Sequence, residues 1–326
     1  MFCCRPVLAS FMRRCVLLMP TVNRNKCATA TYTTQSTTGN REKFNSLCDK
    51  VNIHPKFVSI GAGKIAVALI KGFLAADLKP VSNIIVSDPS PSLKAAAAFQ
   101  ALGVRMESSD PTVLVDNPQS IVFLCTKPNV FKTVAAQCAI ELQSAGMVVS
   151  VMTGITLDAM QQAIGSSTLP IVRVMPNTPA MCDCAASVFA VNQNCTTDHS
   201  ELVQMLMSTV GTCHKVIESY MDPATGLSGS GPAYVYTMID AMSDGGVKMG
   251  LPRDLALHLA AQTVMGAATM VLKSGQNPNE LKNAVCSAGG TTIAGVHALE
   301  LAGTRAAFIS AVEAAVKRAQ ELGKQG

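Results

Sequence analysis

The sequence predicts an α/β domain with a parallel sheet, followed by an all-helical domain. From residue 57 to about residue 218, short apolar stretches that fit strands alternate with helical patterns, which is typical of parallel sheets covered by helices. From Met221 to the end, only helical patterns remain. The length of 326 residues also fits two domains of about 150 residues each. We therefore expect a segment outside the fold over residues 1–50, the α/β domain over 51–218 and the helical domain over 219–326.

A glycine-rich motif, GAGKIA over residues 61–66, stands between the first strand (57–60) and a helix over 67–76. This G-x-G-x-x-A arrangement between strand and helix binds the pyrophosphate of a dinucleotide. The first glycine permits a tight turn, the second lets the backbone approach the pyrophosphate, and small Ala66 lets the helix pack on the sheet. We therefore expect a Rossmann-like domain that binds NAD(P)H through Gly61, Ala62, Gly63, Lys64 and Ile65.

An acid at the end of the second strand bears on which dinucleotide binds. Asn83–Ser87 is predicted as that strand, and Asp88 follows it. A carboxylate here can accept hydrogen bonds from both ribose hydroxyls of NADH, whereas it repels the 2′-phosphate of NADPH. The next residue is Pro89 and the nearest cation is Lys94. We expect Ser87 and Asp88 to contact the cofactor and NADH to be favoured over NADPH; the alternative is that Asp88 only caps the following turn.

Three segments follow apolar strands where open α/β sheets bind their ligands. Ile121–Cys125 is predicted as a buried strand, and Thr126, Lys127 and Pro128 at its end are expected to bind the cofactor. A further strand, Met147–Val151, leads into a turn over 153–155. In the segment Arg173–Pro179, two prolines that bracket Asn and Thr predict a rigid loop.

The helical half contains a second glycine-rich stretch, Ser287-Ala288-Gly289-Gly290-Thr291-Thr292, just before an apolar run. If a helix begins near Thr291, its first N–H groups and positive dipole end make a site for a carboxylate. The alternative is an ordinary helix cap, because Ser and Thr are common before helices.

Three stretches of the helical half, Gly226–Tyr234, Asp244–Pro252 and Leu281–Gly295, together resemble pyrroline-5-carboxylate reductase. The resemblance runs from about Phe57 to Leu322. It implies hydride transfer from NAD(P)H to the cyclic imine of 1-pyrroline-5-carboxylate, giving L-proline in the last step of proline biosynthesis. Once the imine nitrogen is protonated no strong general acid is required, so the protein contributes mainly position and electrostatics.

The resemblance also implies roles for single residues. It makes Thr292 and Ser287 the catalytic residues, with the Thr292 hydroxyl bonded to the ring nitrogen and backbone N–H groups of the loop holding the carboxylate. The residues implied for substrate binding are Ser287, Gly289, Gly290, Thr291 and Thr292, and those implied for the nicotinamide are Thr153 and Asn177.

Several positions depart from the family pattern, among them Met152, Cys184 and Ala288. Two alternatives therefore stay open. One is a relative that reduces another imine or a β-hydroxy acid, for which Lys248 or Lys273 would be the general acid. The other is a non-catalytic paralogue that binds a dinucleotide.

The helical half is rich in Ala and Gly, and about 105 residues of such helices cannot bury all their apolar faces alone. An intertwined homodimer would bury them, and the resemblance implies such dimers, assembled into a larger homo-oligomer. The apolar stretch Leu255–Leu272 carries His258 and Gln262, so we expect a buried helix and no membrane span. The 12 cysteines include no CxxC pair and the histidines lack zinc spacing, so we expect no metal site.

The charge of the chain is unevenly distributed. Six of its 26 Lys and Arg residues and none of its 21 acids lie in residues 1–41, so the rest is nearly neutral despite the net charge of +5. A near-neutral domain does not favour nucleic acid binding. Residues 1–50 are basic, rich in Ser and Thr and without an acid until Glu42, which fits a mitochondrial presequence; the alternative is a disordered N-terminal tail of a cytoplasmic protein.

Overall fold

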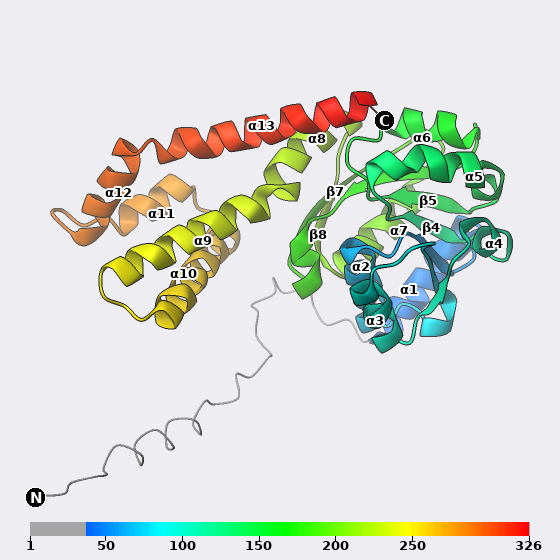
Figure 1. Cartoon of the computed structure of the whole chain (residues 1–326), viewed down its shortest axis with the longest axis horizontal. Coiled ribbons are helices and arrows are strands. Elements are labelled where there is room, and N and C mark those ends of the chain that lie inside the picture. Colours follow the sequence, from blue (N-terminus) through cyan, green and yellow to red (C-terminus); the bar gives the residue numbers. More distant parts are fainter. Residues whose placement is uncertain (1–36, 326) are drawn as a thin grey trace, which may run out of the picture. The chain divides into compact units, whose positions relative to one another are not determined.

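The structure, a computed structural model, describes residues 37–325. An eight-stranded sheet carries helices on both faces and is followed by a helical half, α8 to α13 (Figure 1). This confirms the expected fold class, a Rossmann-like α/β domain followed by a helical domain. The strands are β1 (Phe57–Ile60), β2 (Ile84–Ser87), β3 (Arg105–Glu107), β4 (Ile121–Leu124), β5 (Met147–Ser150), β6 (Ile171–Met175), β7 (Ala185–Val191) and β8 (Gly211–Lys215).

Helices alternate with these strands as far as β8 and then continue alone. The α-helices are α1 (Thr37–Lys50), α2 (Lys64–Ala75), α3 (Leu93–Ala101), α4 (Asp110–Val115), α5 (Phe131–Gln143), α6 (Leu157–Ile164), α7 (Thr197–Ser208), α8 (Met221–Ala224), α9 (Gly231–Lys248), α10 (Arg253–Ser274), α11 (Pro278–Ala284), α12 (Thr291–Leu301) and α13 (Thr304–Gln325). Short 3₁₀-helices are η1 (Val81–Asn83), η2 (Pro128–Val130), η3 (Thr178–Cys182) and η4 (Glu218–Tyr220), and η5 (Thr225–Gly229) is a π-helix.

The strand order is β3-β2-β1-β4-β5-β6-β7-β8, with parallel pairing everywhere except between β6 and β7. The chain runs outward from β1 through β2 to β3 and then returns to the other side of β1 with β4. Ligands of such sheets bind where the strand order reverses, beyond the carboxyl ends of the strands. Here that point lies between β1 and β4. The glycine-rich motif begins directly after β1, at Gly61.

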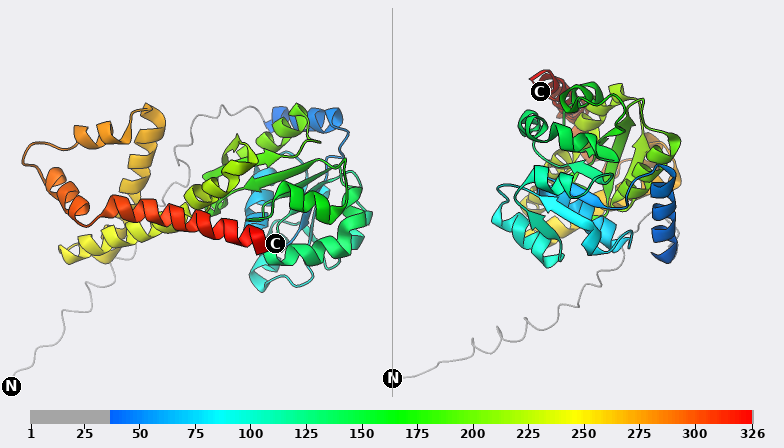
Figure 2. Two further views of the ribbon diagram at one scale, coloured as in Figure 1. Left: turned by 90° about the horizontal axis from the view of Figure 1, so that it is seen from above. Right: turned by 90° about the vertical axis from the view of Figure 1, so that its right-hand side faces the viewer.

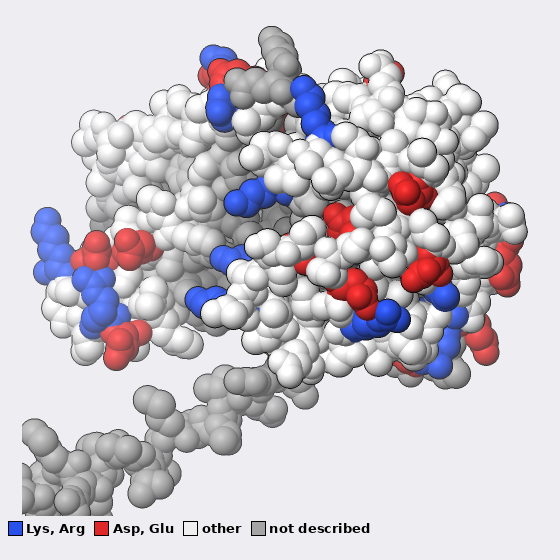
Figure 3. Space-filling model, turned by 45° about the vertical axis from the view of Figure 1, so that its right-hand side comes forward, with Lys and Arg blue, Asp and Glu red and all other residues white. Residues whose placement is uncertain are grey.

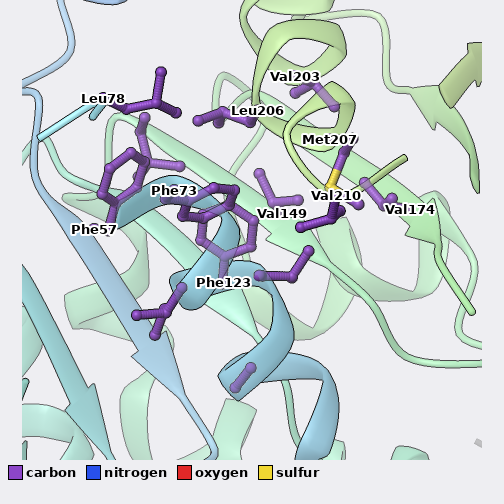
Figure 4. Close-up of a cluster of buried hydrophobic side chains, with 14 of the residues drawn as sticks. Phe57, Phe73, Leu78, Phe123, Val149, Val174, Val203, Leu206, Met207 and Val210 are labelled. Carbon is purple, nitrogen blue, oxygen red and sulfur yellow. The ribbon is translucent and has the colours of Figure 1, made fainter. Parts of the chain in front are cut away.

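Strand β1 is buried on both faces, so its side chains alternate between two cores. Phe57 belongs to the core on one face, while Val58 and Ile60 belong to the core on the other. The Phe57 ring stacks on Phe73 at a centroid distance of 5.0 Å, and Phe73 meets Phe123 at 5.5 Å (Figure 4). The continuous apolar runs that predicted buried parallel strands therefore supply both cores.

The segment predicted to lie outside the fold is partly folded. Residues 37–50 form α1, in which Phe44, Leu47 and Cys48 are buried in the core. The Phe44 ring lies 5.3 Å from that of Phe57, and Lys43 forms a 3.0 Å ion pair with Glu201 of α7. The prediction was wrong for these residues. Their apolar positions are spaced for one face of a helix, but they directly follow the basic stretch that indicates a segment outside the fold. Residues 1–36 lie outside the described residues.

The region after β5 holds two strands, β6 and β7, that were not predicted from the sequence. Arg173, Val174 and Met175, expected in a rigid loop, belong to β6, and the loop begins only at Pro176. Strand β7 was not predicted, because it begins with Ala-Ala-Ser, which has little strand propensity, and its remaining apolar run is short. Pairing with β6 and β8, rather than side-chain propensity, makes it a strand.

The long helix α10, expected to be buried, is mostly exposed in the single chain. Only Ala256 and Ala260 of α10 are buried, while Leu257, Met265 and Leu272 are among its exposed apolar side chains. By length and composition alone, α10 is long and apolar enough to cross a membrane. One such helix is weak evidence for a membrane span. An apolar groove of about 510 Å³ also runs between α9, α12 and α13.

Replacing Phe44 with Ala tests whether α1 is part of the folded domain. Removal of a fully buried ring should lower the free energy of unfolding by about 3–5 kcal/mol, measured by urea denaturation. Lys50→Ala is the control, since Lys50 is half exposed and forms only a 3.6 Å ion pair with Asp198; it should change stability by about 1 kcal/mol at most. Equal stability of the two variants would place α1 outside the cooperative unit.

Candidate active site

The glycine-rich loop is shaped by its contact with the end of β4. Gly61 has φ +101°, and a Cβ on it would lie 2.8 Å from the carbonyl carbon of Cys125. Only glycine meets both conditions without strain. Gly63 follows as the N-cap of α2 with no side chain bonded to the helix end, and it is exposed. The first turn of α2 therefore presents its N–H groups at the surface, as a pyrophosphate site requires.

Asp88 is directed at this loop. Its Oδ2 accepts a 2.9 Å hydrogen bond from the backbone N–H of Ala62, and its Oδ1 accepts one of the same length from Ser90. The carboxylate thus caps the following turn, which is one of the two expected alternatives, and it also binds the backbone of the glycine-rich loop. Its half-buried position at the end of β2 leaves it beside the place where a ribose would lie.

A second carboxylate lies behind Asp88. Ser87, fully buried at the end of β2, donates its hydroxyl to Asp110 at the start of α4. Burial raises the pKa of the Asp110 carboxyl, the hydrogen bond from Ser87 opposes this, and the nearby charge of Asp88 raises the pKa further. The Ser87 hydroxyl, at a residue expected to contact the cofactor, is therefore buried and turned toward Asp110.

A pocket of about 390 Å³ continues along the same edge of the sheet. One wall consists of Ile65 from α2 and residues that follow β5 and β6, and the other comes from the helical half. The lining residues are Ile65, Val151, Thr153, Met175, Pro176, Asn177, Thr178, Thr225, Gly229, Ser230, Ala315, Arg318, Ala319 and Leu322. Its volume suits the nicotinamide half of a dinucleotide with a small substrate.

Of the cofactor residues predicted from sequence, Ile65, Thr153 and Asn177 line this pocket. The others form a row along the carboxyl edge of β1, β2 and β4: Gly61, Ala62, Gly63, Lys64, Ser87, Asp88, Thr126, Lys127 and Pro128. The Thr126 hydroxyl lies 3.4 Å from the sulfur of Met152, so this departure from the family pattern packs under the pocket.

Asn177 is a structural link as well as a lining residue. Its amide donates to the Ser228 carbonyl at 3.0 Å, and its carbonyl oxygen accepts from the Ala186 N–H at 3.1 Å. The side chain thus joins the loop after β6 to β7 and to the helical half. Asn177 shapes the pocket wall with its polar atoms already engaged.

Arg173 also links the α/β domain to the helical half. Its side chain is 2% exposed, and Nη2 lies 2.8 Å from Asp222 of α8. Nη1 lies 3.4 Å from Glu218, whose Oε1 also accepts the Leu157 N–H at the start of α6. A buried cation is tolerated where it is paired in this way, so the start of the helical half is fixed to strand β6.

The predicted substrate loop, residues 287–292, leads into the N-terminal end of α12. Gly290 is the N-cap and no side chain caps the helix, while Gly289 has φ +65°. Gly290 donates its N–H to the Ser287 carbonyl at 3.0 Å, and the Ser287 hydroxyl lies so close that a Cβ on Gly290 would meet it at 2.4 Å. The expected helix start at Thr291 is confirmed, and the N–H groups of its first turn face outward.

The structure does not bring this loop to the pocket of its own chain. Ser287, Gly289, Gly290, Thr291 and Thr292 are absent from the pocket lining, and α11 and α12 lie at the end of the helical half away from the sheet (Figures 1 and 2). Apart from Gly290, which is half-buried, these residues are exposed. A single chain therefore carries the two halves of the expected site in separate places.

The lysines considered as general acids lie elsewhere. Lys248 ends α9 and Lys273 lies in the last turn of α10; both are exposed and neither lines the pocket. Among the described residues, no group of three or more His, Cys, Asp or Glu side chains could hold a metal ion. Neither Lys248 nor Lys273 thus lies at the pocket of its own chain.

Comparison with known proteins agrees with this architecture. Residues 56–154 match the family model for NADP oxidoreductase, coenzyme F420-dependent, and residues 218–322 match pyrroline-5-carboxylate reductase dimerisation. The pyrroline-5-carboxylate reductase of Pisum sativum is 43% identical over 263 residues, 81% of this chain and 94% of the pea protein. The chain belongs to the pyrroline-5-carboxylate reductase family. The expected activity is thereby confirmed at the level of the family.

Members of the pyrroline-5-carboxylate reductase family from distant organisms share the fold. Human pyrroline-5-carboxylate reductase 2 is 40% identical over 265 residues, covering 81% of this chain and 82% of the human protein. The Plasmodium falciparum pyrroline carboxylate reductase with NADP bound superposes with a TM-score of 0.74 at 30% identity, covering 82% of this chain and 98% of that one. The exposed apolar faces of α9 and α10 belong to the segment that matches the dimerisation model, which supports a homo-oligomer.

Sequence reasoning missed the pocket residues contributed by the helical half, above all Ser230 and Arg318. Ser230 lies within the Gly226–Tyr234 motif of the pyrroline-5-carboxylate reductase family, so the motif itself was a usable signal. Arg318 lies on an amphipathic helix whose exposed charges look ordinary in sequence. Only the packing of α13 against the turn after β5 shows that it lines the pocket.

Two glycine variants separate the structural and binding roles of the loop. Gly61→Ala should lower the free energy of unfolding by about 1–3 kcal/mol, because it combines a positive φ with a backbone clash. A Cβ on Gly63 would meet only the Cys125 carbonyl oxygen at 3.7 Å, so Gly63→Ala should cost no more than about 1 kcal/mol. It should nevertheless raise the Kd for NADH, measured by fluorescence titration. Wild-type cofactor affinity in Gly63→Ala would contradict a pyrophosphate contact at this glycine.

Proposed function

We propose that this chain transfers hydride from NAD(P)H to the imine carbon of 1-pyrroline-5-carboxylate and releases L-proline. The observation that carries the proposal is the uncapped start of α12 at Gly290, in the sequence Gly-Gly-Thr-Thr, within a chain of this family. Free N–H groups at a helix start bind a carboxylate, and the adjacent hydroxyl can bind a ring nitrogen.

The residues of the α/β domain fit a dinucleotide. The glycine cradle at Gly61 and Gly63 leaves the room that a pyrophosphate needs, and Asp88 lies beside the loop to accept the ribose hydroxyls. When bound there, the nicotinamide supplies the hydride. Thr153 and Asn177 then line the space around the reacting ring, and Met152 packs beneath it.

The substrate would lie between two copies of the chain. The loop over 287–292 is mostly exposed and does not line its own pocket, while the helical half matches a dimerisation model. We propose that in the homodimer, and in any larger homo-oligomer, the loop of one copy faces the pocket of another. Position and N–H dipoles then supply the catalysis, because an already protonated imine needs no strong acid.

Thr292→Ala tests the site, in an assay of imine-dependent NADH oxidation. Loss of one hydrogen bond to the ring nitrogen should lower kcat/KM by a factor that corresponds to about 1–3 kcal/mol, with little change in cofactor Kd. Thr291→Ala is the matched control, because the proposal uses only the backbone N–H of Thr291. If Thr292→Ala retained wild-type kcat/KM, Thr292 would not contact the substrate. Wild-type protein that binds NADH but reduces no imine would favour the non-catalytic alternative.

NADH is proposed as the preferred cofactor, on the strength of Asp88. A 2′-phosphate beside an ionised carboxylate is opposed by about 4 kcal/mol per pair of unit charges at 4 Å and an effective dielectric of about 20, less what solvent recovers. Asp88→Ser should therefore raise the NADPH to NADH ratio of kcat/KM by about tenfold or more, equivalent to about 1.4 kcal/mol. The ratio in wild-type protein, measured with both cofactors, decides the point: a clear NADPH preference would contradict the role of Asp88.

Mitochondrial import is proposed for the basic, acid-free segment. Because residues 37–50 form a core helix, the address should lie within residues 1–36. Fusion of residues 1–36 to a fluorescent reporter should direct it to mitochondria, and replacing Arg13 and Arg14 with Glu in the fusion should abolish this, since presequences are basic. A diffuse wild-type fusion would instead support the cytoplasmic alternative.

A further inference from the structure

The pocket after β5 and β6 contains one charged side chain among its lining residues, Arg318 of α13. The other lining residues are apolar, glycine, proline or neutral polar. Figure 3 shows Lys and Arg side chains gathered in and around a hollow on the face it views, with Asp and Glu mainly to one side. A ligand with negative oxygens that enters this pocket therefore meets a positive charge from the helical half.

The end of α13, which carries Arg318, packs against the α/β domain. Ala319 is buried, and Gly323 lies so close to the turn after β5 that a Cβ on it would meet the Gly154 carbonyl oxygen at 2.7 Å. In return, a Cβ on Gly154 would lie 3.0 Å from the Gly323 nitrogen. Two glycines thus let the last turns of α13 touch the α/β domain, and Arg318, five residues before Gly323 on the same helix, lines the pocket.

The partner that Arg318 has in the chain leaves it available to a ligand. Its Nη1 lies 2.7 Å from Glu321, but both side chains are 59% exposed. A surface pair of this kind contributes little free energy, so an anionic ligand can replace Glu321 at small cost. The substrate loop around Gly290, by contrast, offers only N–H dipoles and no full charge of its own in the segment 287–292.

We propose that Arg318 is the counter-ion for an anionic oxygen group held in this pocket. This inference rests on the proposed function, which supplies two such groups: the carboxylate of the imino acid and the diphosphate of the dinucleotide. A charge-assisted, bidentate hydrogen bond from a guanidinium suits either one. Arg318 acts in binding and orientation and takes no part in proton transfer.

The experiment compares full-length Arg318→Gln with Lys317→Gln. The control removes the same charge one residue earlier, from a lysine that pairs with Glu313 and does not line the pocket. Arg318→Gln should weaken binding of the anionic group on the order of tenfold with little change in kcat, Arg318→Lys should recover part of the loss, and Lys317→Gln should behave as wild type.

Two measurements identify which group is bound. The first is the Kd of NADH, and the second is the ratio of affinities, in the presence of oxidised cofactor, for proline and for prolinamide, which lacks the carboxylate. A higher NADH Kd in Arg318→Gln shows that Arg318 binds the diphosphate. A lower ratio of proline to prolinamide affinity shows that it binds the carboxylate. If neither quantity differs from the Lys317→Gln control, the proposal is overturned.

Glu321→Gln provides a second variant that keeps the guanidinium and removes its competitor. Because the surface pair contributes little free energy, Glu321→Gln should leave the binding that Arg318→Gln weakens unchanged or slightly stronger, and a weaker affinity counts against the proposal. Wild-type protein without imine reduction would contradict the proposed function whatever Arg318 does. Active wild-type protein with Arg318→Gln equal to Lys317→Gln would contradict only the role of Arg318.

Discussion

The geometry of the site depends on the buried ion pairs of Arg173. Its guanidinium lies inside the molecule between Asp222 and Glu218, and Glu218 in turn accepts a hydrogen bond from the start of α6. A cation so deeply buried is stable only with its acids in place, so strand β6 and the first helices of the helical half keep one arrangement. The pocket, which has one wall from each part, owes its shape to this constraint.

The second constraint is the separation in space between the pocket and the loop at Gly290 of the same chain. The helical half leaves the sheet at α8 and returns to it only with the last turns of α13, while α11 and α12 stay away from the sheet (Figure 2). The same chain therefore completes the pocket after β5 and β6 with Arg318 and Leu322 but not with the loop at Gly290. The exposed apolar faces of α9 and α10 give a physical reason for association, and a partner's loop can then supply what one chain lacks.

The acids at the cofactor end illustrate what burial adds to a motif. Sequence showed that Asp88 follows a strand, but it could not show that Ala62 of the glycine-rich loop donates to it. Nor could it show that Ser87 turns inward to a buried carboxylate at Asp110. Both contacts bring together residues far apart in the chain, and such pairs leave no trace in local pattern.

Local rules failed where tertiary contacts decided the structure. Helix α1 is mildly amphipathic and follows a basic stretch, and only the packing of Phe44 on Phe57 shows that it belongs to the domain. Strand β7 is composed largely of small residues and exists because β6 and β8 flank it. In both cases the stabilising partner belongs to another element, so the local pattern does not show it.

The sequence by itself determined the order of the two domains, the glycine-rich cradle, the helix start at Thr291 and the family. These features rest on residue types at short spacing, such as glycine at positive φ or an apolar run before a turn. Only the tertiary structure decided that the cradle and the substrate loop of one chain lie apart, that residues 37–50 are part of the core and that Arg318 lines the pocket. Those outcomes follow from which surfaces pack together, a property of the whole chain that short stretches do not encode.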